Sequence, residues 1–275
     1  MRTHPDLSIV IPAYNEEARL EPTVRAYLDH CRATRRSAEV IVVDDGSRDG
    51  TSHVVEGLTD EYPELRLIRL AENRGKGFAV RSGVVNARGT LILFADADGA
   101  TPLGELDRLE QAIAAGADIA IGSRALDGTG VQVTARLYRR VIGRAFHLLV
   151  ETLTVRSIRD TQCGFKLFRE PVAHELFARM RMNGFSFDVE VLMMAQRQGY
   201  RIAEVPVNWT HQPGSKVNLV LDSARMARDL FIIRGRYMRG EYNVPHMTPF
   251  SSEVRSAPRR SDGAGAEMAA TIPES

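Results

Sequence analysis

Short apolar runs alternate with longer amphipathic stretches through the first half of the chain. The apolar runs predict five strands, at residues 7–12, 39–43, 65–70, 90–95 and 117–121. The stretches between them have apolar residues at helical spacing and predict helices at 16–33, 51–61, 77–87 and 103–115. Runs such as residues 40–43 are apolar on both alternating faces, which is typical of parallel strands covered by helices on both sides. The pattern therefore predicts an α/β fold with a Rossmann-like, mostly parallel sheet.

The second half of the chain is less regular and is expected to extend the same sheet. It predicts helices at 134–153, 188–198 and 219–238 and strands at 164–168 and 201–207. Residues 246–275 hold few large apolar side chains, so they are not expected to form a core. We predict one domain over residues 1–240 and a disordered tail over residues 241–275.

Composition and charge narrow the class of protein. The 275 residues are 44% hydrophobic and 26% charged, as in ordinary globular proteins. The net charge of +1 provides no overall field for nucleic acid, so no nucleic-acid partner is expected. No signal peptide and no run of about 18 apolar residues is evident, and we expect no membrane-spanning helix. With only two cysteines, the chain is expected in the reducing cytoplasm.

Acidic residues follow three of the predicted strands, at the sheet edge where α/β proteins bind ligands. Asp96 and Asp98 are two residues apart, so in an extended segment both carboxylates face the same way and can share a divalent cation. The alternative is an ordinary turn or helix cap. Asp45 follows the second strand, where its carboxylate can accept the N–H of a nucleobase or can belong to a capped turn.

The segment 73–77 follows the third predicted strand, and its glycines allow the backbone to approach a phosphate or a base closely. It matches neither the GxxxxGK[ST] phosphate loop nor the GxGxxG dinucleotide motif. This difference argues against a kinase-type ATPase and against a nicotinamide oxidoreductase.

Four motifs, in this order and spacing, resemble the family 2 glycosyltransferases of the GT-A fold. They read IVIPAYNEE, VIVVDDGSRDGT, NRGKGFAVRSG and LILFADADGAT. Further motifs resemble the subgroup that contains the dolichyl-phosphate β-glucosyltransferases and the polyprenyl-phosphate sugar synthases. These read IGSRA, RDTQCGFKLF, FDVEVL, EVPVNW and GSKV, and the whole resemblance spans about residues 7 to 240.

The resemblance implies a nucleotide-sugar donor and a set of residues that contact it. On the donor side these residues are Pro12, Tyr14, Glu16, Asp45, Lys76, Asp96, Ala97, Gln162, Lys166 and Lys216. Asp96 and Asp98 match the DxD-type motif, in which the second aspartate binds the Mg²⁺ or Mn²⁺ ion that bridges the donor diphosphate. The subgroup favours a UDP-sugar, with a GDP-sugar as the alternative.

The resemblance also implies a polyprenyl phosphate as acceptor. Arg124, with Arg136 or Arg140, is expected to hold the acceptor phosphate, because guanidinium groups suit phosphate oxygens. Asp188 and Glu190 match the region of the catalytic base in relatives that use hydroxyl acceptors. The alternative is that Asp188 caps a helix and Glu190 lies in its first turn. A phosphate oxygen is already anionic near neutral pH, so a strong base matters less than positioning.

The sequence thus predicts an inverting, metal-dependent transferase, with Asp98, Asp188 and Arg124 as the residues at the reaction centre. It is expected to move glucose from UDP-glucose to a polyprenyl phosphate. The alternatives are a family 2 enzyme that uses a sugar hydroxyl, a GDP-mannose-dependent polyprenyl-phosphate mannose synthase, and a non-catalytic module that binds a nucleotide or a lipid carrier.

A lipid acceptor predicts contact with the cytosolic face of a membrane. Arginines lie among bulky apolar residues in 136–150 and again in 219–238, a composition typical of interfacial helices. The alternative is that both helices pack on the core with solvated arginines.

Overall fold

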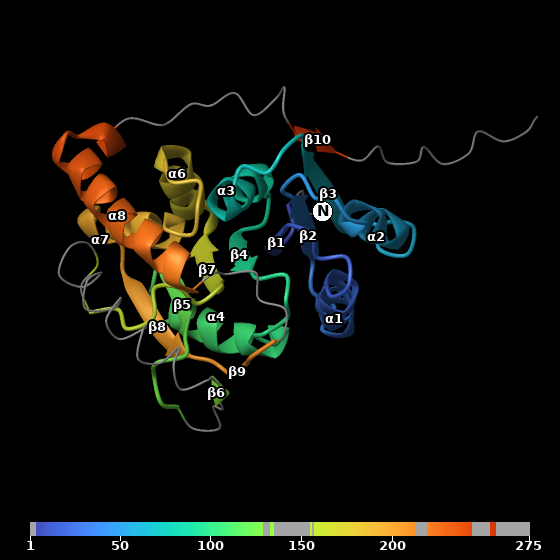
Figure 1. Cartoon of the computed structure of the whole chain (residues 1–275). Coiled ribbons are helices and arrows are strands. Elements are labelled where there is room, and N and C mark those ends of the chain that lie inside the picture. Colours follow the sequence, from blue (N-terminus) through green and yellow to red (C-terminus); the bar gives the residue numbers. More distant parts are fainter. Residues whose placement is uncertain are drawn as a thin grey trace, which may run out of the picture.

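One eight-stranded sheet runs through the protein in a computed structural model that describes residues 4–128, 133–134, 155, 157–212, 219–243 and 254–256 (Figure 1). Its strand order is β10-β3-β2-β1-β4-β7-β5-β8. The strands are β1 (Leu7–Ala13), β2 (Ala38–Asp44), β3 (Leu65–Leu70), β4 (Leu91–Ala95), β5 (Ile119–Ser123), β7 (Phe165–Arg169), β8 (Ile202–Pro206) and β10 (Val254–Ser256). β7 and β10 pair antiparallel with their neighbours, and the other pairs are parallel. A second sheet pairs β6 (Val133–Thr134) with β9 (Trp209–Thr210).

Helices cover both faces of the large sheet. They are α1 (Leu20–Ala33), α2 (Thr51–Leu58), α3 (Lys76–Asn86), α4 (Leu106–Ala114), α6 (Glu170–Arg179), α7 (Phe187–Arg197), α8 (Leu219–Met238) and the 3₁₀ helices η1 (Leu103–Glu105) and η2 (Glu241–Asn243). The protein has two hydrophobic cores, and alternate residues of β1 belong to different ones. Val10 belongs to the core that includes residues of α3, α6, α7 and α8. Ile9 and Ile11 belong to the core that includes residues of α1, α2 and α4. Burial on both faces explains why the strands are almost wholly apolar.

The five strands predicted in the first half are confirmed, with ends that differ by at most two residues. In the second half β7 inserts antiparallel between β4 and β5, and the helix α6, which the pattern does not predict, follows it directly. The predicted helix at 134–153 is wrong at Thr134, which pairs in β6 with β9; residues 135–153 lie outside the described ranges.

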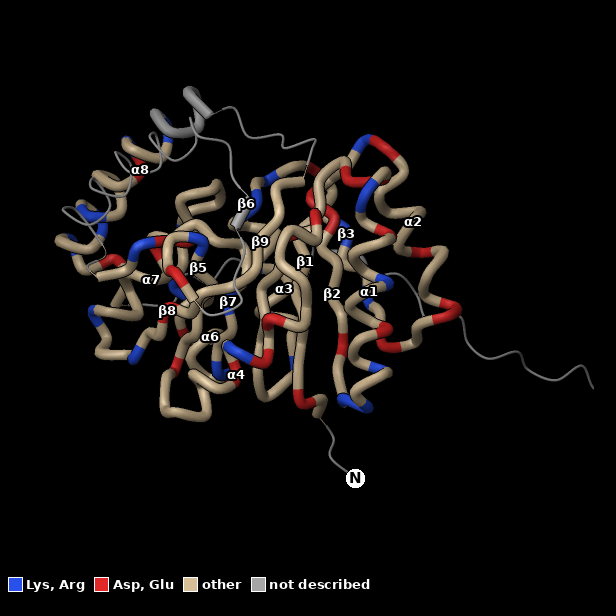
Figure 2. The backbone as a smooth tube through the Cα atoms, turned by 90° about the horizontal axis from the view of Figure 1, so that it is seen from below, with Lys and Arg blue, Asp and Glu red and all other residues tan. Residues whose placement is uncertain are grey.

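Two short elements lie beyond residue 240. η2 buries Tyr242, whose side chain is 4% exposed, and β10 pairs with β3 at the sheet edge. Figure 2 shows that charged residues of both signs are spread over the described fold, with several basic positions on α8. Within the described ranges, no helix combines the length and apolar character needed to cross a membrane.

Candidate active site

The loops after β1 and β2 are locked together at the carboxyl edge of the sheet. The backbone N–H of Asn15 donates to Ser47 Oγ at 2.8 Å, and Asn15 Oδ1 accepts from the N–H of Arg48 at 2.8 Å. The N–H of Glu16 donates to Thr51 Oγ1 at 2.7 Å. These hydrogen bonds join two loops that are far apart in the sequence, and together the loops form one side of the site.

Asp44 and Asp45 have different surroundings. Asp44 accepts from the N–H of Ser47 at 2.8 Å and from the hydroxyl of Ser52, so it holds its own turn. Asp45 accepts from the backbone N–H groups of Arg74 and Gly75, each at 2.8 Å. Burial raises the pKa of Asp45, and these two donors act in the opposite direction. The base contact of Asp45 stays a prediction, but its carboxylate anchors the loop that precedes α3.

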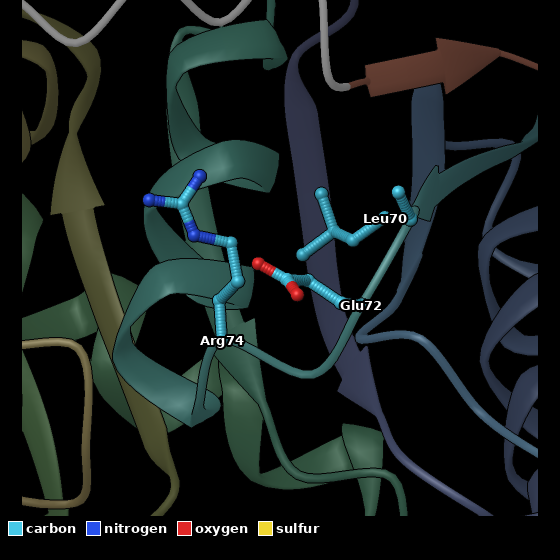
Figure 3. A pocket seen from close by; sticks show the side chains of 4 residues that line it. Leu70, Glu72 and Arg74 are labelled. Carbon is cyan, nitrogen blue, oxygen red and sulfur yellow. The ribbon is translucent and has the colours of Figure 1, made fainter.

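A small pocket lies beside this loop, at the carboxyl end of β3. Leu70, Ala71, Glu72 and Arg74 line it, and Figure 3 shows the labelled side chains around it. The guanidinium carbon of Arg74 lies 3.8 Å from the ring centroid of Phe78. Arg74 lies within the matched NRGKG motif, but its residue type alone predicts no role for it.

Lys76 connects the glycine-rich turn to the DxD motif. Its Nζ lies 2.7 Å from Asp96 Oδ1 and 5.3 Å from the ring centroid of Phe94. Burial lowers the pKa of Lys76, but the charges of Asp96 and Asp188 outweigh that effect and raise it. Lys76 is therefore a stable cation at the edge where the donor is expected.

The DxD carboxylates retain capacity for a ligand. The Asp96 side chain is 34% exposed, and Asp98 Oδ1 accepts from the N–H of Ala100 at 3.1 Å. The intervening Ala97 is buried. Burial, and then the charge of Asp96, raise the pKa of Asp98. The two carboxylates would hold a divalent cation, whose charge would relieve this repulsion.

The donor set fits Mg²⁺ or Mn²⁺. Hard cations at phosphate sites take only one or two carboxylates, and the substrate phosphates and water supply the other oxygens. In the described part of the chain, no group of three or more His, Cys, Asp or Glu side chains gathers around one point. Asp96 and Asp98 could supply the one or two carboxylates of such a site.

Arg19 and Glu16 lie at the same edge. The guanidinium of Arg19 donates to both carboxylate oxygens of Glu16, with an Nη2–Oε1 distance of 2.8 Å. The bond to Glu16, together with the charges of Asp98 and Asp96, raises the pKa of Arg19. Tyr14 is half-buried and Pro12 is buried. The electrostatic interaction of Arg19 with Asp98 and Asp96 links the segment that follows β1 to the DxD carboxylates.

Asp188 forms a buried ion pair at the start of α7. Lys166 Nζ donates to Asp188 Oδ1 at 2.5 Å and to the carbonyl of Cys163 at 2.6 Å, and the two side chains are 2% and 4% exposed. Burial raises the pKa of Asp188, while the charges of Lys166 and Lys76 oppose the rise. The expected contact of Lys166 with the nucleotide-sugar donor stays a prediction. In this structure its ammonium forms an ion pair with Asp188.

The helix-cap interpretation of Asp188 is wrong, because the residue before α7 is Ser186 and Asp188 is the second residue of the helix. Glu190 lies in the first turn but accepts from the backbone N–H groups of Arg181 and Met182 at 2.9 and 2.8 Å. Of the two acidic residues, Asp188 is the one that is coupled electrostatically to Lys76 and Asp96.

Arg124 is held at the end of β5 by Asp160. Its Nε and Nη2 donate to the two carboxylate oxygens at 2.7 and 2.8 Å, and its backbone N–H donates at 2.9 Å. The charge of Arg124 keeps the pKa of Asp160 low despite burial, which acts to raise it. Asp160 could not be predicted as this partner, because nothing in the local sequence links it to an arginine 36 positions away.

Gln162 lies next to this pair, and its backbone N–H lies 3.3 Å from Asp160 Oδ1. Its Nε2 is buried without a hydrogen-bond partner among the described residues. A buried amide donor of this kind is costly unless a ligand or water accepts its proton. Arg136, Arg140 and Lys216 lie outside the described residues.

Gly164 provides a test of the DxD geometry. A Cβ on Gly164 would lie 2.0 Å from Asp96 Oδ2, whereas a Cβ on Gly57 in α2 would meet nothing within 4 Å. Gly164→Ala is expected to displace the Asp96 carboxylate and to lower turnover about 100-fold. Gly57→Ala is the control, and it should keep full activity and raise the free energy of unfolding by about 0.4–1 kcal/mol. Equal turnover of the two variants would contradict this placement of Asp96.

The fold and the site together define a glycosyltransferase of the GT-A type. The family model "Glycosyl transferase family 2" matches residues 8–177, and the chain belongs to that family. A "Dolichyl-phosphate beta-glucosyltransferase" of Drosophila melanogaster is 43% identical over 256 residues, which cover 87% of this chain and 77% of the relative. The human protein of the same name is 40% identical over 251 residues, covering 86% of this chain and 78% of the relative.

A solved structure agrees in fold. Glucosyl-3-phosphoglycerate synthase from Mycobacterium tuberculosis, in complex with Mn²⁺, UDP and glucosyl-3-phosphoglycerate, matches with a TM-score of 0.62 and 18% identity. The match covers 88% of this chain and 81% of that chain. This likeness confirms the predicted mostly parallel GT-A sheet.

Proposed function

We propose that this glycosyltransferase moves glucose from UDP-glucose to a dolichyl-type polyprenyl phosphate, with inversion at the anomeric carbon. The observation that carries the proposal is the Lys76–Asp96 pair beside Asp98, because a lysine and two carboxylates together suit a donor diphosphate and its metal ion. The choice of glucose and of a lipid phosphate is supported by the relatives at 43% and 40% identity.

On the donor side, Lys76 neutralises negative charge on the diphosphate. Its ammonium stays protonated because Asp96 and Asp188 outweigh the effect of burial. Asp96 and Asp98 would hold Mg²⁺ or Mn²⁺, which when bound supplies Lewis-acid stabilisation of the departing nucleoside diphosphate. Asp45 and Arg74 position the loop beside the pocket, where we place the nucleobase.

On the acceptor side, Arg124 binds the lipid phosphate. Its bonds to Asp160 use Nε and Nη2, and we assign Nη1 to the phosphate. Arg136 and Arg140 are proposed as further phosphate contacts. A phosphate oxygen needs no strong base to become a nucleophile, so Asp188 acts by fixing Lys166 and by its charge.

We also place α8 at a membrane surface. Phe231 and Met238 are 60% and 77% exposed, and the arginines of α8 lie on the same helix (Figure 2). Apolar and cationic side chains together suit the headgroup layer of an anionic bilayer. Contact there would bring the lipid acceptor to the enzyme.

The test is a product assay. Purified protein is incubated with Mg²⁺, a short-chain polyprenyl phosphate and separate UDP- and GDP-sugars, and lipid products are detected by mass spectrometry. We expect glucosyl-phospholipid from UDP-glucose, and its loss on addition of EDTA. Formation of mannosyl-phospholipid from GDP-mannose instead would show that the donor is GDP-mannose and not UDP-glucose. Transfer to a sugar hydroxyl alone would overturn the lipid assignment and leave the family unchanged.

A further inference from the structure

The carboxylate of Glu190 is fully buried and joins three parts of the chain. Oε2 accepts from the N–H groups of Arg181 and Met182 at 2.9 and 2.8 Å, and Oε1 accepts from the hydroxyl of Tyr242 at 2.7 Å. Arg236 Nη1 lies 4.0 Å from Oε1. A residue of α7 therefore ties the segment 181–184 to η2, which follows α8.

The segment 181–184 packs directly against the turn that carries Lys76. The carbonyl of Asn183 accepts from the N–H of Phe78 at 3.2 Å. A Cβ on Gly75 would lie 2.5 Å from Asn183 O, and a Cβ on Gly77 would lie 2.5 Å from Met182 O. Since there is no room for a methyl group at either glycine beside Lys76, a movement of residues 182–183 toward the turn would displace it.

The C-terminal unit of α8 and η2 is fastened to the same region at two further points. Ser186 Oγ donates to Asp229 Oδ2 at 2.9 Å, in a buried bond. Arg181 Nη2 donates to the carbonyl of Glu241 at 2.8 Å. The unit is thus hydrogen-bonded to both ends of the segment 181–186. This segment contacts the glycine turn through Asn183 and precedes Asp188 in the chain.

We propose that Glu190 and Tyr242 are positioning residues, which hold Lys76 in register with Asp96 through the backbone of residues 181–184. The path runs from the Tyr242 hydroxyl to the Glu190 carboxylate, then to two backbone N–H groups, and from Asn183 O to the first turn of α3. The catalytic consequence rests on the proposed function, because it takes Lys76 as a diphosphate contact; the structural path does not.

Tyr242→Phe tests this path, with Tyr200→Phe as the matched control. The control removes a similar hydrogen bond, which Tyr200 Oη donates to Glu175 Oε2 at 2.6 Å. Tyr200 lies just before β8, and Glu175 lies in α6. We expect faster hydrogen exchange at the Phe78 amide in Tyr242→Phe and an unchanged rate in Tyr200→Phe. We expect kcat to fall about tenfold in Tyr242→Phe with little change in KM, because misplacement acts on the transition state.

A second variant separates positioning from folding. Glu190→Gln keeps the size of the side chain and one oxygen that can accept from the backbone, so it should retain more activity than Glu190→Ala at equal folded fraction. Unchanged Phe78 exchange in Tyr242→Phe, or a kcat equal to that of Tyr200→Phe, would overturn the proposal. If the wild type forms no glucosyl-phospholipid, the proposed function fails, and the exchange rates alone decide the positioning role.

Discussion

Asp98→Asn is expected to lower glucosyl transfer about 10³-fold, because a metal ion at a departing phosphate contributes several kcal/mol to the transition state. The amide keeps an oxygen that can accept from Ala100 N–H, as Asp98 does at 3.1 Å, so the local turn should persist. What the variant loses is negative charge beside Asp96. The measurement is the initial rate at increasing Mg²⁺, together with Mn²⁺ affinity by calorimetry in the presence of UDP.

Asp107→Asn is the matched control, since Asp107 is an exposed residue of α4. It should leave both the rate and the Mn²⁺ affinity unchanged. An Asp98→Asn protein that keeps metal-dependent turnover at the wild-type level would remove Asp98 from the metal site. A protein that loses turnover but keeps Mn²⁺ affinity would also contradict the assignment.

Lys166→Met is expected to lower the free energy of unfolding by about 3–5 kcal/mol, because it leaves a buried carboxylate without its cationic partner. Both side chains of the Lys166–Asp188 pair are almost fully buried, at 2% and 4% exposure, so solvent does not screen the loss. Guanidinium denaturation, followed by far-UV circular dichroism, measures the change. Arg25→Met is the control, and it removes exposed ion pairs with little expected effect on unfolding.

The double variant Lys166→Met/Asp188→Leu completes the experiment. Replacing a buried ion pair by apolar groups of similar size is often neutral for stability, so this protein should unfold near the wild-type midpoint. Its activity should stay low, because Asp188 is then absent from the site. A single Lys166→Met variant as stable as Arg25→Met would contradict the buried ion pair.

The strands of the first half could be predicted because burial makes most of their positions apolar, as in the buried run at residues 40–43 of β2. The orientation of β7 could not, since the apolar residues of a single strand do not tell whether it runs parallel or antiparallel to its neighbours; the pairing with β4 and β5 is antiparallel. α6 has ten residues and follows β7 without a loop, so its short apolar pattern merges with that of the strand. Tyr242 is a single aromatic residue, and composition alone does not reveal its buried partner.

The site was predictable where its residues are close in sequence. Asp96 and Asp98 follow one strand, and local motif similarity is enough to find them. Asp188 and Glu190 were not separable, although residues two apart on a helix point in different directions. In the structure Asp188 accepts a hydrogen bond from Lys166, and Glu190 accepts one from Tyr242, 52 positions away. Such pairs depend on tertiary packing.

The position of β7 has a consequence for biosynthesis. β4 pairs with β1 on one side, but its other neighbour begins at Phe165, which pairs with Ala95. At ribosomal rates of about 5–20 residues per second, synthesis of the intervening segment of about 70 residues takes several seconds. During that interval the apolar strand LILFA is an open edge, which other chains can pair with. Until residues 165–169 have been made, the centre of the finished sheet is therefore an edge.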